Sequence, residues 1–276
     1  MRTRTLSILS AGLLTSALAS PALAGNDKDR CNTNPGVLPP QSHAYGKTYG
    51  EWSAAWWQWV NAIPVHDTNG NNQHPLWDTT GEDALRGQSG PVWFLAGMND
   101  AFPDPNDPNS FYGIAEREVT IPTGKALFFP ILNAECSVVE GNGQTEQELR
   151  DLAAYYINHT QHLACELDGL SLRHIERYRA DSPAFTMQAI EDNWLDASYG
   201  AEGYFPVGSS TLAVSDGVYL MLAPLPGGEH ELHFSGAYVF TADEDGFDYT
   251  FSLDITYHLT VEADGHDHGH DGGHGH

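Results

Sequence analysis

Residues 247–261 read Phe-Asp-Tyr-Thr-Phe-Ser-Leu-Asp-Ile-Thr-Tyr-His-Leu-Thr-Val, and this stretch decides the fold class. Apolar side chains occupy every odd position from Phe247 to Val261, and polar side chains occupy every even position. Side chains of a β-strand alternate between two faces, so the pattern predicts a strand with one face on a core and one in water. Such a strand needs neighbours and an apolar layer opposite it, and we expect an antiparallel sheet.

Shorter strands are expected earlier in the chain. Apolar runs bounded by turn-forming residues predict them at residues 91–97, 119–121, 126–132, 211–214, 218–222 and 230–234. The Pro-Thr-Gly sequence at 122–124 separates two of these runs and predicts a hairpin-like pair. Asp216-Gly217 separates two others and is a typical hairpin turn. The second half of the chain is therefore predicted to form an antiparallel meander.

Two helices are expected to begin at capping-box sequences. Thr48 and Thr145 are each followed three residues later by a glutamate, a spacing at which each side chain accepts a hydrogen bond from the other residue's backbone amide. Apolar side chains then repeat at helical spacing, from Trp52 to Ile63 after the first box and from Leu149 to Leu163 after the second. The predicted fold is mainly β with flanking helices (α+β), as an antiparallel β-sandwich of jelly-roll-like type.

The N-terminus has the features of a secretory signal peptide. Two arginines precede an apolar run at residues 6–18, and small residues follow at 22–24. We expect residues 1–24 to be removed by cleavage after Ala24, and the protein to be exported to the periplasm or the extracellular space. No later segment is long and apolar enough to span a membrane. Residues 25–44 are expected to form an extended arm, 45–262 a single domain, and 263–276 a tail of low complexity.

The net charge excludes some classes of partner, and the cysteine count limits the disulfides that can form. The formal net charge of −25 makes nucleic acid and anionic lipid unexpected partners. An exported chain with three cysteines leaves at least one unpaired within the monomer. Cys136 and Cys165 bracket the second predicted helix and are the expected disulfide pair. Cys31 is then free or bonded to another molecule.

The tail carries the clearest metal-binding pattern. Five imidazoles and two carboxylates lie within eleven residues of one another, at His266, Asp267, His268, His270, Asp271, His274 and His276. These donor types suit borderline divalent ions such as Zn²⁺, Ni²⁺ and Cu²⁺. We therefore expect metal ions as partners. The alternative is an idle or engineered tail, although the interspersed Gly and Asp are unlike an ordinary oligohistidine tag.

A second metal site is conceivable on the predicted second helix. His159 and His162 lie three residues apart, so on a helix they would share a face, with Glu135 or Glu140 as a third donor. No His-Glu-x-x-His sequence supports this site. An exposed polar helix face is the more economical interpretation.

The tryptophans support a different function. Trp57 lies about 100° around the first helix from Trp56, so it faces either a second packed layer or a cleft where a ligand stacks on it. The sequence thus leaves two function classes: a binding protein whose tail captures divalent transition metals, or a secreted hydrolase or lyase whose Trp-rich cleft holds a glycan or another extracellular polymer. Whether the protein is an enzyme stays open at this point.

Four motifs resemble a family of uncharacterised exported bacterial proteins. They are residues 51–59 (EWSAAWWQW), 87–97 (GQSGPVWFLAG), 121–131 (IPTGKALFFPI) and 228–230 (GEH). The resemblance spans about residues 45–261 and implies export and a shared fold, with no activity attached. It also implies cysteines at the positions of Ala84 and Val119, so a disulfide of the relatives is expected to be missing from this chain.

Overall fold

In the computed structural model, which describes residues 34 and 36–262, the alternating stretch forms strand β11 (Tyr249–Val261). From Leu253 onward every odd position is buried, while the even positions are partly or fully exposed. The prediction of a strand with one buried face is confirmed. β11 occupies the middle of a six-stranded sheet with the order β2-β3-β11-β10-β5-β6.

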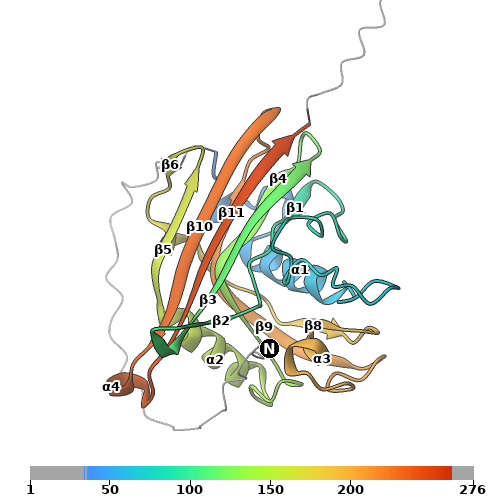
Figure 1. The fold of residues 1–276 in the computed structure, drawn as a ribbon, viewed down its shortest axis with the longest axis vertical. Helices are drawn as coiled ribbons and strands as arrows, with labels where there is room; N and C mark the ends of the chain where they lie inside the picture. Colours follow the sequence, from blue (N-terminus) through green and yellow to red (C-terminus); the bar gives the residue numbers. More distant parts are fainter. Residues whose placement is uncertain (1–33, 35, 263–276) are drawn as a thin grey trace, which may run out of the picture.

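The six-stranded sheet is mixed rather than antiparallel throughout. Its other strands are β2 (Phe102–Asp104), β3 (Asp107–Ile121), β10 (Gly228–Phe240), β5 (Thr160–Leu167) and β6 (Leu170–Ser171). β10 pairs antiparallel with β11, as expected for the meander. β3, however, runs parallel to β11 from Ser110 to Ile121. Figure 1 shows these three long strands side by side.

The second sheet has five strands and packs against the buried face of the first. It contains β1 (Val92–Phe94), β4 (Ala126–Ser137), β9 (Ser210–Leu222), β7 (Arg179–Asp181) and β8 (Phe185–Gln188), with β4 and β9 at its centre. Phe129 of β4 lies 5.1 Å from Phe234 of β10 between ring centroids, so the two sheets meet through aromatic side chains. The predicted mainly β, sandwich-like fold is confirmed.

The predicted hairpin around residues 122–124 is wrong, because β3 and β4 belong to different sheets. β3 alternates between buried and exposed positions, as a strand with one face in water does. β4 is buried at nearly every position up to Leu132, as a strand covered on both faces is. The turn therefore carries the chain from one sheet to the other.

The predicted hairpin turn at Asp216-Gly217 is also wrong, because β9 runs straight through it. A Cβ atom on Gly217 would lie 2.6 Å from the Cβ of Asn133 on the neighbouring strand. The glycine is thus required for close approach and not for a turn. Asp216 accepts a hydrogen bond of 2.6 Å from Arg179 on β7.

Both predicted helices are present, and both capping boxes are formed. α1 (Tyr49–Asn61) begins after Thr48, and α2 (Glu146–Asn158) begins after Thr145. Ser215 of β9 contacts Ser53 of α1, whereas its neighbour Val214 packs in a cluster with residues of α2. Successive strand residues face opposite ways, so the two helices cover opposite faces of the five-stranded sheet.

The remaining helices are short. α3 (Trp194–Tyr199) precedes β9, and α4 (Ala242–Asp245) lies in the connection from β10 to β11. The 3-10 turns are η1 (Pro40–Ser42), η2 (Ala44–Gly46) and η3 (Ile175–Tyr178). Within residues 34 and 36–262, no helix is long and apolar enough to cross a membrane.

The expected disulfide between Cys136 and Cys165 is not formed. Both are buried free thiols that belong to different packed clusters: Cys136 packs with Leu149 and Ala153 of α2, and Cys165 belongs to the main core. Burial raises the pKa of the Cys165 thiol to about 12. Bracketing a helix in sequence did not bring the two sulfurs together, because β4 and β5 lie in different sheets. Cys31 lies outside the described residues.

Candidate functional site

A cavity of about 280 Å³ lies between α1, the edge of β4 and the inner face of the six-stranded sheet. The segment that follows β1 closes another side, through residues 97–99 and Ala101. Most of the side chains that line the cavity are apolar or aromatic. They belong to Trp56, Trp57, Leu76, Met98, Ile131, Leu132, Tyr156, Tyr238, Phe240, Tyr249, Phe251 and Leu253. Most binding sites for small molecules have this composition.

The cavity exists because β4 has a partner strand on one side only along most of its length. β1 pairs with β4 from Ala126 to Phe128, and β9 pairs with its opposite edge as far as Ser137. Among the described strands none pairs with β4 beyond Phe128 on the β1 side. Residues 130–134 of β4 line the cavity along this edge. The site is therefore bounded by a strand edge as well as by side chains.

The tryptophans of α1 form one wall. Trp56 is fixed, because its Nε1 donates to the carbonyl oxygen of Leu95 at 2.9 Å. Trp57 packs edge-on against Trp56, with ring centroids 4.9 Å apart, and lies 5.8 Å from Trp194 of α3. Trp57 joins a second packed layer, with 7% of its surface exposed, and it also lines a cavity. Its stacking on a ligand stays a prediction.

Two lining residues carry a buried polar group without a hydrogen-bond partner in the described part of the chain. These groups are Trp57 Nε1 and the Tyr238 hydroxyl, while the amide of Asn133, a third lining residue, lies beside the Tyr219 hydroxyl. Burial of the phenol, together with the neighbouring Tyr219 and Asp216, raises the pKa of Tyr238 well above its ordinary value. The hydroxyl therefore stays protonated, and both unpaired groups are hydrogen-bond donors. Each unpaired buried donor costs about 1–3 kcal/mol.

The described residues that line the cavity include no carboxylate, imidazole, ammonium or guanidinium group. General acid–base catalysis uses such groups and also tyrosine, which lines the cavity as Tyr156, Tyr238 and Tyr249. The lining also supports binding through apolar contact and a few hydrogen bonds.

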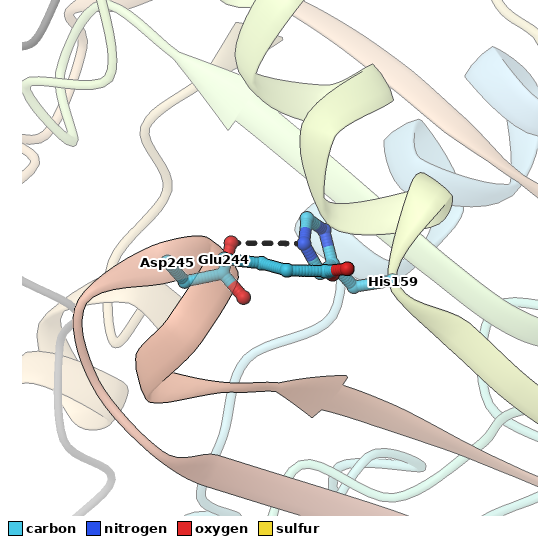
Figure 2. Close-up of side chains that lie close together, drawn as sticks. All are labelled: His159, Glu244 and Asp245. Atoms are coloured by element: carbon cyan, nitrogen blue, oxygen red, sulfur yellow. Dashed lines mark ion pairs between the residues drawn. The ribbon is translucent and has the colours of Figure 1, made fainter.

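A second cluster of interest lies behind the cavity wall, where α2 meets α4 (Figure 2). His159 follows the last residue of α2, and Asp245 ends α4. The His159 Nε2 lies 2.9 Å from Asp245 Oδ1, and Glu244 offers a third ligand atom close by. The imidazole stacks on Phe240, with centroids 4.5 Å apart and planes at 21°. Because Phe240 lines the cavity, the two sites share this ring.

Asp245 is held in place by its neighbours. Oδ1 accepts a hydrogen bond of 2.7 Å from the Tyr155 hydroxyl, and Oδ2 accepts one of 2.9 Å from the amide of Thr241. Burial works to raise the pKa of Asp245, but these hydrogen bonds and the nearby His159 outweigh it and hold the pKa below its ordinary value. Asp245 is therefore ionised at neutral pH.

The predicted pairing of His159 with His162 is wrong. α2 ends at Asn158, so His162 lies on β5, where it is exposed and has a φ of 55°. The predicted third donors belong to another group: Glu140 accepts a hydrogen bond from Tyr199, and Glu135 is buried beside Glu140 and Ser137. Burial, followed by the charge of Glu140, raises the pKa of Glu135 well above its ordinary value.

Several predicted site residues fall outside the described residues. They are the tail residues His266, Asp267, His268, His270, Asp271, His274 and His276. Sequence reasoning in turn missed Asn133, Tyr238 and Asp245. A signal was available for Asn133, which follows an almost entirely apolar run on a central strand. Nothing in the local sequence distinguishes Tyr238 or Asp245 from other residues of their type.

Comparison with known proteins gives little guidance. No family model matches the chain, and no curated protein matches it. A solved structure of the Plasmodium falciparum protein Pf12p is similar at a TM-score of 0.18 and 10% sequence identity, over 59% of this chain and 44% of that chain. The matched region is thus less than half of that protein.

Proposed function

We propose that the protein is a binding protein, which holds one small, mainly apolar molecule with a hydrogen-bond acceptor in the cavity beside β4. One observation carries the proposal: two residues that line an otherwise apolar cavity, Trp57 and Tyr238, have a buried donor without an acceptor in the described part of the chain. Buried polar groups are nearly always paired in proteins, so such a concentration at one place needs an explanation. A ligand carbonyl, carboxylate or ether oxygen would pair with one or more of them.

The size of the cavity restricts the ligand. Its volume of about 280 Å³ is just below the range of about 300–1,000 Å³ that is usual for ligand pockets. A single aromatic ring system or a short acyl chain fits this volume. An extended polymer does not, and the lining has no carboxylate pair of the kind that glycoside hydrolysis requires. No contact within the described residues favours the polysaccharide-acting alternative.

We retain export and metal binding by the tail as parts of this proposal. Both rest on segments outside the described residues, at 1–24 and 263–276. A periplasmic or extracellular binding protein for a small molecule is consistent with the acidic surface charge, which keeps a protein soluble.

Filling the mouth of the cavity should weaken ligand binding. Ala101 lines the cavity and is half-buried, so Ala101→Phe adds volume without removing a core contact. Binding of small aromatic carbonyl compounds and medium-chain carboxylic acids is measured by quenching of tryptophan fluorescence, since Trp56 and Trp57 line the site. We expect at least one compound to bind, and Ala101→Phe to weaken its binding by about tenfold or more, a change of about 1.4 kcal/mol.

The matched control for this experiment is Ala164→Phe. Ala164 is exposed on β5 and does not line the cavity, so this variant should bind like the unmodified protein. Equal weakening in both variants, or no saturable binding of any compound, would contradict the proposal.

Tyr238→Phe should weaken ligand binding without lowering the free energy of unfolding. In the free protein it removes a buried hydroxyl that has no partner, so the free energy of unfolding should stay the same or rise by about 1 kcal/mol. In the complex it removes a donor, so affinity should fall by about fivefold. Urea denaturation and the fluorescence titration measure the two effects.

Tyr112→Phe is the control, because Tyr112 is 39% exposed on β3 and does not line the cavity. Tyr112→Phe should change neither the free energy of unfolding nor the affinity for the ligand. If Tyr238→Phe instead lowers the free energy of unfolding and leaves affinity unchanged, the hydroxyl is structural and does not serve a ligand.

A further inference from the structure

The His159 Nε2 faces a carboxylate oxygen, and the arrangement requires a cation between them. The His159 Nδ1 lies 2.7 Å from the carbonyl oxygen of Tyr155, an acceptor only, so Nδ1 carries a proton. In the neutral ring, Nε2 then has a lone pair. That lone pair would point at Asp245 Oδ1, which is 2.9 Å away and has lone pairs of its own. Either a proton or a metal ion must lie between the two atoms.

We propose that His159, Glu244 and Asp245 form a binding site for one divalent transition-metal ion of the Zn²⁺ class. The ligand atoms of these three residues all lie within 4.8 Å of one another (Figure 2). Imidazole nitrogen and carboxylate oxygens are ligands that Zn²⁺ accepts at about 2.0–2.2 Å. In a tetrahedral site such ligand atoms are separated by about 3.3 Å. The His159 and Asp245 atoms are a few tenths of an ångström closer than that.

The groups around these ligands already have the orientation that metal sites use. A ligating histidine usually donates its other ring N–H to a carbonyl or carboxylate, and His159 does so to Tyr155. The Tyr155 hydroxyl and the Thr241 amide hold the carboxylate of Asp245. The His159 and Asp245 side chains are 15% and 3% exposed, so these two ligands are preorganised by packing.

Glu244 is the ligand that an ion from solvent can reach first. It is exposed on α4, and its side chain makes no hydrogen bond or ion pair in the described part of the chain, so it can rotate onto an ion that arrives from solvent. Three protein ligands leave a fourth position for water. When the ion binds, it replaces the proton on Nε2, and that proton is released to solvent. The ion would join the end of α2 to the β10–β11 connection.

The site lies far from the C-terminal end of β11, where the described part of the chain ends. β11 lies between the site and the tail in the sequence, because α4 precedes this strand and residue 263 follows it. At about 3.3 Å per residue, its 13 residues span about 40 Å. Figure 1 shows α4 at one end of the long strands and the C-terminal end of β11 at the other.

Hydrogen exchange on the full chain tests the site without interference from the tail. Zn²⁺ should slow amide exchange at residues 155–159 and 241–245 of the unmodified protein. Glu244→Gln, at an exposed position, should fold normally and need a Zn²⁺ concentration more than about tenfold higher for the same protection, because loss of even an outer partner costs about 10–100-fold. His159→Gln should lose the effect.

His162→Gln is the matched control, since His162 is exposed on β5 and outside the cluster. Its Zn²⁺ dependence should equal that of the unmodified protein. The proposal is overturned if Zn²⁺ leaves exchange at both segments unchanged, or if Glu244→Gln responds to Zn²⁺ like the unmodified protein. Neither readout needs a ligand in the cavity, so this test can fail or succeed apart from the proposed function.

Discussion

Arg117→Met is expected to lower the free energy of unfolding by about 3–5 kcal/mol, because each buried acceptor left without a donor costs about 1–3 kcal/mol. Arg117 is 1% exposed, on the inner face of β3. Its guanidinium donates to the carbonyl oxygens of Pro75, Asp78, Ala96 and Gly97 and to the hydroxyl of Tyr257. Methionine fills similar space but donates no hydrogen bond, so only Ala96, which also accepts from the Tyr257 hydroxyl at 2.8 Å, keeps a side-chain donor.

The substitution should destabilise the whole fold, because Arg117 connects segments that are distant in the sequence. It joins the turn region at residues 75–78 and the segment after β1 to the centre of the six-stranded sheet, where Tyr257 lies on β11. Urea denaturation followed by tryptophan fluorescence measures the free energy of unfolding. Arg177→Met is the control, because Arg177 is exposed and should tolerate the change. An equal, small effect for both variants would show that Arg117 does not stabilise the fold.

Local patterns in the sequence predicted local structure well. The alternation of residues 247–261 gave β11 because one sheet face is buried and the other is in water, and the two capping boxes gave the first residues of α1 and α2. These signals need only the residues that form the element. The end of α2 was missed, because the apolar spacing continues to Leu163 although the chain turns into β5 at Thr160.

Pairing between distant strands could not be read from such patterns. Asp216-Gly217 has the composition of a turn, and only the presence of Asn133 across the strand explains why a glycine is needed there. The candidate sites likewise depend on contacts between distant segments, which local sequence patterns do not reveal. Trp57 was recognised from its angular position on a helix, whereas Tyr238 becomes a candidate only because its buried hydroxyl makes no hydrogen bond to the described residues.

One of the four sequence motifs has a clear structural role among the described residues. In residues 87–97, Gln88 donates to the carbonyl oxygens of Ala84 and Phe94 and accepts from the amide of Phe94. This side chain therefore fixes the end of β1 beside α1. Ala84 and Val119 are both buried, at 6% and 5% exposure, and contribute to the apolar core.

Truncation after Glu262 is expected to remove most of the metal-binding capacity of the chain. The deleted segment contains five of the fourteen histidines, interleaved with carboxylates. Neutral imidazole is the ligand, with an ordinary pKa near 6.5, so protons compete with Zn²⁺, Ni²⁺ or Cu²⁺ and binding by the intact chain should fade as the pH falls through that value. Calorimetric titration of both proteins at pH 7.5 and pH 5.5 measures the stoichiometry.

Truncation should leave the melting temperature of the metal-free protein almost unchanged, because β11 ends at Val261 and no described element is removed. The truncated protein should still bind about one ion, at His159, Glu244 and Asp245. Adding Glu244→Gln to the truncation should weaken that remaining binding, whereas adding His162→Gln should not. If the truncated protein binds as many ions as the intact chain, the tail is not the main site, because its five imidazoles were then never needed.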